Sequence, residues 1–462
     1  MSKIDEAIST YLVDQNNFSH ETIESASLAF LDAYGCILDA AADENASKHA
    51  LPFGYSSTLS DHPFKVIRNL NTEFEIARYL RTLVRWHDYN DTFLAKEWAH
   101  PSDNIGGIMA STMRYLDSPR LKDIFIGIIK TYEIQGNLAL GTSLNQKGYD
   151  HVFYVKLATA AYSSSLMHNS SKTTISRTIN NVLSDGLNLR AYRHEPNIGR
   201  RKSWAAGDAT SRGLWLAQVS SYNDSNYSSV QNDEVWGFEK VFLDGESIVL
   251  GKNLDDWVVR NILYKVAYPA EFHGQSAVEA AISLHPLFSD KFDDIELIII
   301  ETHEPALRII SKSGPLDNPS ARDHSLEYMT SVALLDGKLT SMSYEDSYEK
   351  IHEVESLRKK FKTIENKQYT KDYYDIEKRY IPNKIYFEYK DGSHSEKKEI
   401  LYPIGHPARR DEALPLLKDK FIRNCERYHS EEFSSNLWDE TLDGSFTSQR
   451  LFDFLENVSS HE

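Results

Sequence analysis

The sequence predicts a mostly α protein, with a large helical domain and a smaller α/β domain inserted near its C-terminal end. A chain of 462 residues is long enough for two or three domains, each with its own core. Apolar residues follow the helical period through most of the first half, and strand-like segments begin only after residue 268. The helical pattern returns after Pro403. We therefore predict a helical domain from residues 1–265 and 403–462, enclosing an α/β domain at 266–402.

The helices of the first half are predicted from apolar residues at helical spacing. Ser19, a residue type that caps helix N-termini, precedes one apolar face formed by Ile23, Ala26, Phe30, Ala33 and Ile37. Residues 121–140, 152–161 and 211–219 repeat the pattern. The polar stretch 220–226 predicts a surface loop.

The α/β domain is predicted from two apolar segments and a hairpin signal. Residues 295–302 and 384–389 each have the composition of a buried strand. Asp391-Gly392 predicts a tight turn after the second strand, with 396–401 as the returning strand. The charged segment 344–380 predicts exposed helices and loops, and 411–428 predicts a helix of the C-terminal piece.

Charge and cysteine content exclude several classes of function. The chain has 51 lysines and arginines against 68 aspartates and glutamates, a net charge of -17, so nucleic acid is not an expected partner. Its two cysteines, Cys36 and Cys425, are too few for a disulfide framework, a cysteine-ligated zinc site or an iron–sulfur cluster.

The N-terminal residues match neither a secretory signal nor a transit peptide, and no apolar stretch approaches the ~20 residues of a membrane span. We expect a cytoplasmic protein that does not bind membranes, with the mitochondrial matrix as the alternative.

Polar residues suited to chemistry gather in five segments, at 87–104, 148–151, 193–207, 268–273 and 314–328. The first contains two histidines, several acids and a threonine in an otherwise apolar helical context. Asp91 or Thr92, and Ser102 or Asp103, could instead cap two successive helices. The residues as a group favour a functional site.

The third segment places four cations between Arg193 and Lys202 on a strongly acidic chain. Such a cluster could hold a small polyanion with the help of a helix N-terminus. The alternative is a solvated loop that pairs with acidic neighbours. His151, His273, Arg322 and Tyr328 in the other segments could each be functional or structural.

A metal-dependent hydrolase is a further alternative. The doublet His87-Asp88 looks like the metal-binding pair of HD-type phosphohydrolases. A two-residue match is common by chance in a chain of this length, and that site needs more ligands from neighbouring helices. The sequence has no activated-serine motif, glycine-rich phosphate loop or nucleotide-binding fingerprint.

Several longer motifs resemble one family. They are 85–92 (RWHDYNDT), 97–104 (EWAHPSDN), 132–136 (YEIQG), 150–152 with Lys156, 192–194 (YRH), 201–209 (RKSWAAGDA), 268–273 (YPAEFH), 322–324 (RDH) and 402–406 (YPIGH). In this order, they resemble the PrpD-type dehydratases of the MmgE/PrpD superfamily. The matched region runs from about residue 20 to about residue 420.

The resemblance implies a cofactor-independent hydro-lyase without a metal. Such an enzyme would convert the small tricarboxylate 2-methylcitrate to 2-methyl-cis-aconitate in propionate catabolism, with citrate as a possible second substrate. It also implies a large helical domain, a smaller α/β lid domain and a homodimer. A relative of the cis-aconitate decarboxylases, or a non-catalytic binding protein, stands as an alternative.

The resemblance also implies the site residues. The related cis-aconitate decarboxylases surround their substrate with an Asp, a Thr, three His, a Lys and a Tyr. Carried over motif by motif, six of these fall on Asp88, Thr92, His100, His151, Lys202 and Tyr328. The third histidine falls on His273 in the dehydratase pattern, although the decarboxylase position is nearer Gln275. We expect Asn90, Arg193, Arg201 and Arg322 to bind the substrate.

Dehydration requires removal of a C–H proton next to a carboxylate while a β-hydroxyl leaves. We expect the cations around Lys202 to neutralise the developing charge. His151 or His100 would be the base, oriented by Asp88, unless Asp88 is itself the base. Tyr328 or His273 would donate a proton to the departing hydroxyl.

Overall fold

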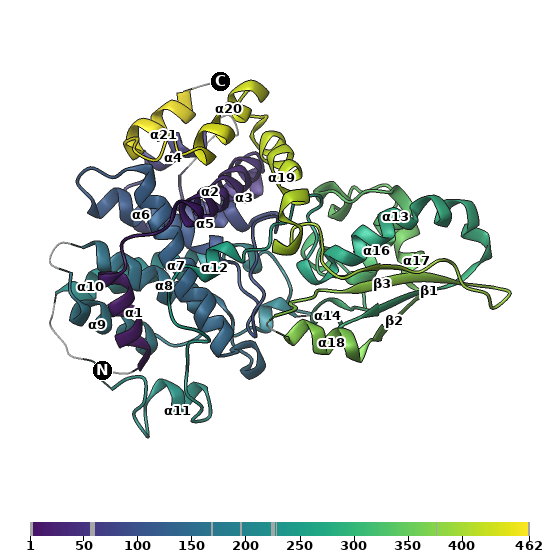
Figure 1. The fold of residues 1–462 in the computed structure, drawn as a ribbon, viewed down its shortest axis with the longest axis horizontal. Coiled ribbons are helices and arrows are strands. Elements are labelled where there is room, and N and C mark those ends of the chain that lie inside the picture. The colour runs from purple at the N-terminus through teal and green to yellow at the C-terminus, as the bar shows by residue number, and fades with distance from the viewer. Residues whose placement is uncertain are drawn as a thin grey trace. The chain divides into compact units, whose positions relative to one another are not determined.

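The computed structural model describes residues 3–55, 61–167, 170–194, 196–222, 227, 229–375 and 377–460. The chain divides into two compact units (Figure 1). Unit 1 consists of Met1–Asn197, Arg201–Leu263 and Lys418–Glu462, and unit 2 of Ile198–Arg200 and Tyr264–Leu417.

Unit 1 is helical. Its longer helices are α1 (Lys3–Asp14), α2 (His20–Ala41), α5 (Glu73–Arg85), α6 (Ile105–Tyr115), α7 (Leu121–Gly141), α8 (Val152–Leu166), α9 (Lys172–Ser184), α10 (Arg201–Ser221), α20 (Glu431–Leu442) and α21 (Leu451–Ser460). Shorter helices are α3 (Glu44–Ala50), α4 (Pro63–Ile67), α11 (Phe238–Phe242) and α12 (Trp257–Arg260), with 3₁₀ turns η1 (Pro101–Asn104), η2 (Asn145–Lys147) and η3 (Ala191–Arg193). Helix α19 (Arg410–Cys425) begins in unit 2 and ends in unit 1.

Two glycines let the helices of unit 1 pack closely around α5. A Cβ atom on Gly106 of α6 would collide with the α5 backbone at Ala77 and Arg81. A Cβ atom on Gly207 of α10 would meet Thr82 of the same helix. Helices α6 and α10 therefore approach α5 at a distance that other residues would prevent, which brings polar side chains of all three close together.

Unit 2 is built on a four-stranded sheet in the order β2-β1-β3-β4. The strands are β1 (Ile295–Thr302), β2 (Phe361–Glu365), β3 (Asn383–Tyr389) and β4 (Lys398–Ile400). Strand β1 pairs in parallel with β2, Ile298 opposite Phe361, and antiparallel with β3, while β3 and β4 pair antiparallel.

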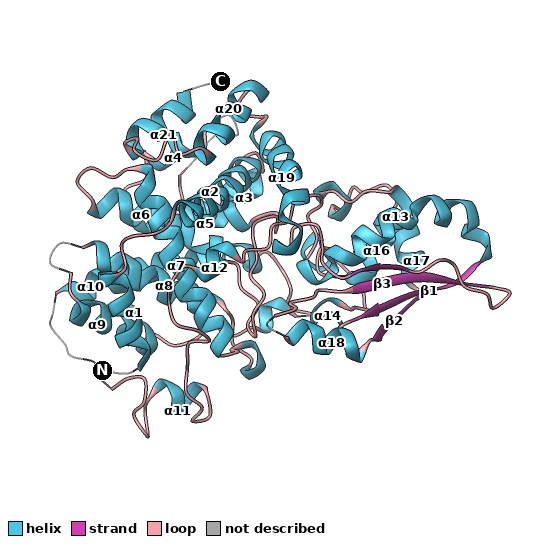
Figure 2. Cartoon of the chain, in the orientation of Figure 1, coloured by secondary structure: helices cyan, strands magenta, loops and turns pink. Residues whose placement is uncertain are grey.

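Helices cover this sheet. Figure 2 shows α13 (Gln275–Lys291), α16 (Leu326–Asp336) and α17 (Ile351–Arg358) along one face, where their apolar side chains form a single core with β1 and β3. The remaining elements of unit 2 are α14 (Glu304–Ile310), α15 (Pro319–Arg322), α18 (Lys367–Tyr374) and the 3₁₀ turns η4 (Phe272–Gly274), η5 (Phe292–Asp294), η6 (Ser341–Tyr344) and η7 (Pro407–Arg409).

The predicted mostly α fold class with a small α/β part is confirmed. Ser19 caps α2 by accepting a hydrogen bond from the Thr22 amide, and β1 coincides with the predicted strand 295–302. The Asp391-Gly392 turn follows β3, and Gly392 has a φ of 81° that favours glycine.

Two segments differ from the prediction. The segment 344–380, expected to hold helices and loops, contains strand β2. This strand is five residues long and lies at the sheet edge, so it lacks the apolar run of a buried strand. The expected loop at 220–226 begins with the last two residues of α10, and 223–226 lie outside the described residues.

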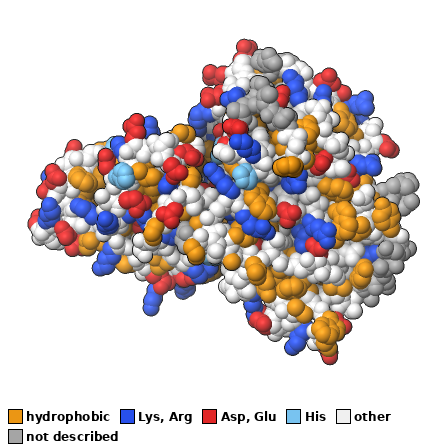
Figure 3. Space-filling view, turned by 180° about the vertical axis from the view of Figure 1, so that it is seen from behind, with side chains coloured by type: hydrophobic (Ala, Val, Ile, Leu, Met, Phe, Trp, Pro, Cys, Tyr) orange, Lys and Arg blue, Asp and Glu red, His pale blue; other side chains and the backbone are white. Residues whose placement is uncertain are grey.

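Among the described residues no single helix is long and apolar enough to cross a bilayer; α2 and α3, bent by 105° at their junction, reach that length and composition only together. Most of α2 is buried within unit 1. Acidic and basic side chains are interspersed over the face drawn in Figure 3. Among the described side chains of this face, neither sign of charge dominates a large area.

Candidate active site

The C-terminal end of α5 positions the first group of candidate residues. The chain turns after Arg85, where the Asp88 amide donates to the Arg85 carbonyl over 3.1 Å. Asp88 has a φ of 52°, in the left-handed region that non-glycine residues seldom occupy. The turn places the Asp88 carboxylate against the Arg85 guanidinium, and both side chains are buried.

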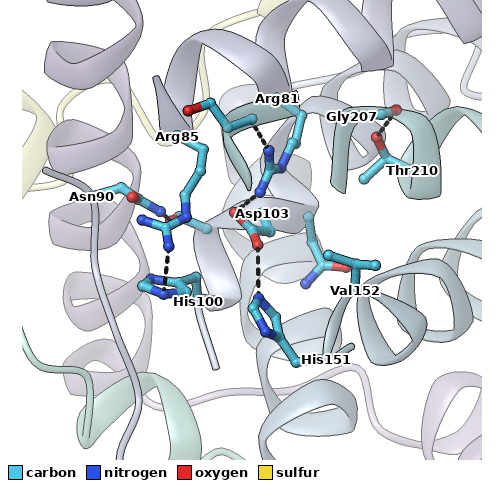
Figure 4. A network of polar contacts seen from close by, with 12 residues as sticks. Arg81, Arg85, Asn90, His100, Asp103, His151, Val152, Gly207 and Thr210 are labelled. Carbon is cyan, nitrogen blue, oxygen red and sulfur yellow. Dashed lines mark hydrogen bonds and ion pairs between the residues drawn. The ribbon is translucent and has the colours of Figure 1, made fainter. Parts of the chain in front are cut away.

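Arg85 also contacts His100. The guanidinium Nη2 donates to His100 Nε2 over 3.0 Å (Figure 4). His100 Nδ1 donates to the Asp91 carbonyl over 2.9 Å, which places the ring proton on Nδ1. His100 is therefore a neutral imidazole whose Nε2 lone pair is covered by Arg85.

His151 lies beside His100, with 5.7 Å between the ring centroids. Its Nδ1 is 3.5 Å from Asp150 Oδ1 and its Nε2 is 4.0 Å from Asp103 Oδ2. Burial lowers the pKa of His151 well below its usual range; Asp150 opposes this shift, and the nearby arginine charges add to it. The imidazole is thus neutral at physiological pH, and two carboxylates would stabilise it once it accepts a proton.

A fully buried ion pair connects this histidine to α10. Asp103 Oδ1 lies 2.6 Å from Arg81 Nη2, and Arg81 Nη1 donates to the Ser203 carbonyl over 2.5 Å (Figure 4). Ser203 follows Lys202 in the first turn of α10, where the Lys202 side chain is buried. Arg81 thereby fixes Asp103 on one side and the backbone next to Lys202 on the other.

In the cationic segment between residues 193 and 202, two arginines have partners within unit 1; residue 195 lies outside the described residues. Arg193 holds Asp150 in a two-pronged ion pair, with 2.5 Å from Nε to Oδ2 and 3.1 Å from Nη2 to Oδ1. This pairing holds the pKa of Asp150 below its usual range, although burial alone would raise it. Arg201 stacks over the rings of Tyr192 and Trp204. Arg193 therefore orients the neighbour of His151.

Asn90 and Thr92 are also buried in unit 1. Asn90 Nδ2 donates to Ser102 Oγ over 2.7 Å, and the Thr92 backbone exchanges two hydrogen bonds of 2.9 Å with Leu263. The alternative that Ser102 or Asp103 caps a helix is wrong, because Asn104 precedes α6 and makes no side-chain cap, while Asp103 pairs with Arg81.

The His87-Asp88 doublet lacks the features of a metal-binding pair. His87 lies in a turn after α5, with Nδ1 2.7 Å from Asp39 Oδ2 and Nε2 3.6 Å from Asp43 Oδ2. Burial would lower the pKa of His87, but the two carboxylates raise it to about 9. A protonated imidazole has no lone pair for a metal ion.

In unit 2, His273 forms a chain of hydrogen bonds. Its Nδ1 lies 2.8 Å from Glu271 Oε1, and its Nε2 lies 3.0 Å from the Tyr373 hydroxyl. Burial would raise the pKa of Glu271, but His273 lowers it to about 2, so the carboxylate is ionised. Glu271 therefore orients the His273 imidazole, as the aspartate of a catalytic triad orients its histidine.

Arg322 and Tyr328 have structural neighbours in unit 2. Arg322 donates to the Leu316 and Tyr344 carbonyls and pairs with Asp346 over 2.7 Å. The Tyr328 hydroxyl donates to the Ser343 carbonyl over 2.8 Å, and burial raises its pKa to about 12. Gln275, the alternative position for the third histidine, donates to two backbone carbonyls.

The predicted residues therefore lie in two groups, one in each unit. Asp88, Asn90, Thr92, His100, His151, Arg193, Arg201 and Lys202 belong to unit 1, and His273, Arg322 and Tyr328 to unit 2. Residues that were not among the predicted site residues hold them: Arg81, Arg85, Asp103, Asp150, Glu271 and Tyr373. Arg85, Asp103, Asp150 and Glu271 each lie within three positions of a predicted residue, in the same motif, which was the available signal.

Comparison with known proteins gives a consistent match along the chain. The family model of the MmgE/PrpD N-terminal domain matches residues 6–250, and that of the MmgE/PrpD C-terminal domain matches residues 268–443.

Individual relatives match over nearly the full length. A 2-methylcitrate dehydratase of Escherichia coli O157:H7 is 38% identical over 449 residues, covering 94% of this chain and 92% of the relative. A mitochondrial 2-methylcitrate dehydratase of Yarrowia lipolytica is 38% identical, covering 91% and 84%. A probable 2-methylcitrate dehydratase of Saccharomyces cerevisiae is 39% identical, covering 91% and 86%.

Proposed function

The chain belongs to the MmgE/PrpD family, and on that premise we propose that it is a hydro-lyase that dehydrates 2-methylcitrate to 2-methyl-cis-aconitate. The observation that carries this proposal is the similarity to proteins named 2-methylcitrate dehydratase over 94% of the chain. Similarity of that extent includes both groups of candidate residues.

The base is one of two neutral imidazoles. The proton to be removed lies next to a carboxylate, so its loss creates additional negative charge on an already anionic substrate. His100 and His151 are both buried and lie 5.7 Å apart, within reach of one small molecule. A neutral imidazole accepts a proton, and Asp103 and Asp150 would stabilise the resulting cation on His151.

Cations of unit 1 neutralise the developing charge. Lys202 is buried at the start of α10, where the helix N-terminus adds to the positive potential. Arg193 acts indirectly, because its guanidinium holds Asp150 beside His151. Asp88 orients Arg85, which itself contacts His100.

For protonation of the departing hydroxyl, the contacts favour His273 over Tyr328. His273 carries an ionised carboxylate partner on one nitrogen and a phenol on the other, an arrangement that passes protons. The Tyr328 proton is instead directed at the Ser343 carbonyl inside the core.

The decisive experiment offers the purified protein 2-methylcitrate, citrate and cis-aconitate in parallel, and follows alkene absorbance and product mass together. We expect alkene formation from 2-methylcitrate with loss of one water, and slower reaction with citrate. Release of carbon dioxide from cis-aconitate would make the protein a decarboxylase. Tight binding of 2-methylcitrate without any product would make it a binding protein.

The same assay with EDTA tests the requirement for metal. We expect full activity in EDTA and after replacement of both Cys36 and Cys425 by alanine, because both thiols are buried and burial raises their pKa values. Loss of activity in EDTA, restored by a divalent ion, would favour a metal-dependent enzyme.

We also propose that the protein is a homodimer of the cytoplasm or the mitochondrial matrix. Val235, Trp236 and Val241, on and before α11, are 61%, 83% and 52% exposed, the kind of apolar surface that subunit contacts bury. Light scattering on the purified chain measures the mass directly; a mass of one chain, 52.9 kDa, at micromolar concentration would contradict the dimer.

A further inference from the structure

We propose that Arg85 is the residue that binds the carboxylate next to the reacting C–H bond, and that it uncovers the base His100 when it does so. This inference rests on the proposed function and deepens it. In the structure His100 is covered: the Arg85 guanidinium donates to His100 Nε2 over 3.0 Å and pairs with Asp88.

The other buried arginines of this group have partners that a substrate would not readily displace. Arg193 grips both oxygens of Asp150. Arg81 joins Asp103 to the Ser203 carbonyl, and neither Arg81 nor Asp103 has exposed side-chain surface. Breaking either ion pair would leave a buried carboxylate without its cation, which is costly.

Arg85 differs in one of its acceptors. The Asp88 acceptor is a charged carboxylate, whereas the His100 acceptor is the Nε2 atom of a neutral imidazole. A charged acceptor forms a stronger hydrogen bond with a guanidinium than a neutral acceptor does. A substrate carboxylate can therefore replace His100 while the Asp88 pair stays in place, and no buried charge loses its partner.

The exchange also gives a role to the left-handed backbone conformation of Asp88. A left-handed aspartate at the end of α5 holds its carboxylate back against Arg85, only three positions away. Asp88 anchors the guanidinium at Nη1, while Nη2, which bonds to His100, can exchange that acceptor for a carboxylate. Asp88 is then a positioning residue for Arg85.

As a chemical consequence, the base His100 lies next to Arg85, the cation that binds the substrate carboxylate. When Arg85 Nη2 moves from His100 Nε2 to a substrate carboxylate, the freed lone pair lies beside that carboxylate. The most acidic C–H of the substrate is the one attached to it. The C–H electron pair can then form the new alkene as the C–O bond breaks and the β-hydroxyl leaves as water with a proton from the proposed acid, His273. His100 holds the proton that it removed. The step needs no oxidant or further reactant.

The first test measures binding without turnover. Tricarballylate has three carboxylates but no hydroxyl, so it cannot be dehydrated, and calorimetry gives its Kd. We expect Arg85→Gln to weaken binding about ten- to hundredfold, because one charge-assisted pair is lost, and Arg85→Lys to weaken it less. The matched control is Arg114→Gln, an exposed arginine 3.8 Å from Glu73, which should leave the Kd unchanged. An unchanged Kd in Arg85→Gln overturns the proposal.

The second test needs no variant and so does not depend on the folding of one. A crystal structure of the wild-type protein with tricarballylate should show the Arg85 guanidinium on a ligand carboxylate and His100 Nε2 without its arginine donor. A complex in which Arg85 remains on His100 overturns the exchange.

Activity separates this inference from the proposed function. If the wild-type protein forms no alkene from 2-methylcitrate, the function is wrong whatever Arg85 does. If it does form the alkene and Arg85→Gln keeps the wild-type KM and kcat, the function stands and the role of Arg85 is wrong.

Discussion

Asp103 Oδ1 lies 2.6 Å from Arg81 Nη2, and neither side chain has exposed surface. The pair connects α5, η1 and, through the Ser203 carbonyl, α10. Since Asp103 also lies 4.0 Å from His151, this buried contact links the packing of the helices to the surroundings of a candidate base.

Breaking this pair should destabilise unit 1. Arg81→Met and Asp103→Asn each leave a buried charge without its partner, so we expect each to lower the free energy of unfolding by about 3 kcal/mol or more. The double variant should be more stable than the sum of the two losses implies. Chemical denaturation followed by circular dichroism measures all four proteins. Strictly additive losses would show that the two side chains act independently.

Substitutions in the candidate site of unit 1 should abolish turnover without unfolding the protein. We expect His100→Gln, His151→Ala and Lys202→Ala each to lower kcat at least ~100-fold, because each removes either proton transfer or charge neutralisation. Lys172→Ala is the matched control, since this lysine pairs with Asp14 at the surface. Near-normal activity of both His151→Ala and Lys202→Ala would exclude this site.

How far the sequence could predict this site depended on the kind of contact. The family resemblance assigned His100 and His151 to one predicted site, and the structure places their rings 5.7 Å apart. Arg81 lies outside the family motifs, and a single arginine within a helix has no distinctive pattern. Arg85 lies in the motif 85–92, but its contact with His100 depends on packing in three dimensions. The close approach of α6 and α10 to α5 depends on Gly106 and Gly207, whose meaning emerges only in three dimensions.

The expected anion-binding arginines illustrate the same limit. Arg193 and Asp150 are 43 positions apart, and Arg322 and Asp346 are 24 apart, so neither pairing could be recognised along the chain. Direct substrate binding by Arg193 and Arg322 stays a prediction. Their present partners favour structural roles, because a buried cation needs a carboxylate or carbonyl beside it.

The contact between Glu271 and His273 should control catalysis in unit 2. Glu271→Gln keeps the size of the side chain but removes the charge that orients the imidazole, and we expect kcat to fall about 100-fold with little change in KM. Glu304→Gln, which alters a carboxylate paired with Arg308 on α14, is the control. A kcat within twofold of the wild type in Glu271→Gln would assign His273 a purely structural role.

The buried carboxyl group of Asp91 should make stability depend on pH. Burial raises its pKa from 3.8 to about 7, above the value in the unfolded chain. The folded state therefore holds its proton more tightly. The cost of ionising Asp91 is absent below about pH 4, grows between about pH 4 and pH 7, and is complete above that range.

Asp91→Asn isolates this effect. The amide oxygen can still accept the Ser102 amide hydrogen bond of 3.0 Å, and the backbone carbonyl can still accept from His100, but nothing titrates. We expect the free energy of unfolding of the wild type to fall relative to the variant as the pH rises from 4 to 7, by on the order of a few kcal/mol. Unfolding curves at several pH values measure the difference, with the surface change Asp14→Asn as control. A difference that stays constant over this range, or that changes in the opposite direction, would mean that Asp91 is already ionised at low pH in the folded protein.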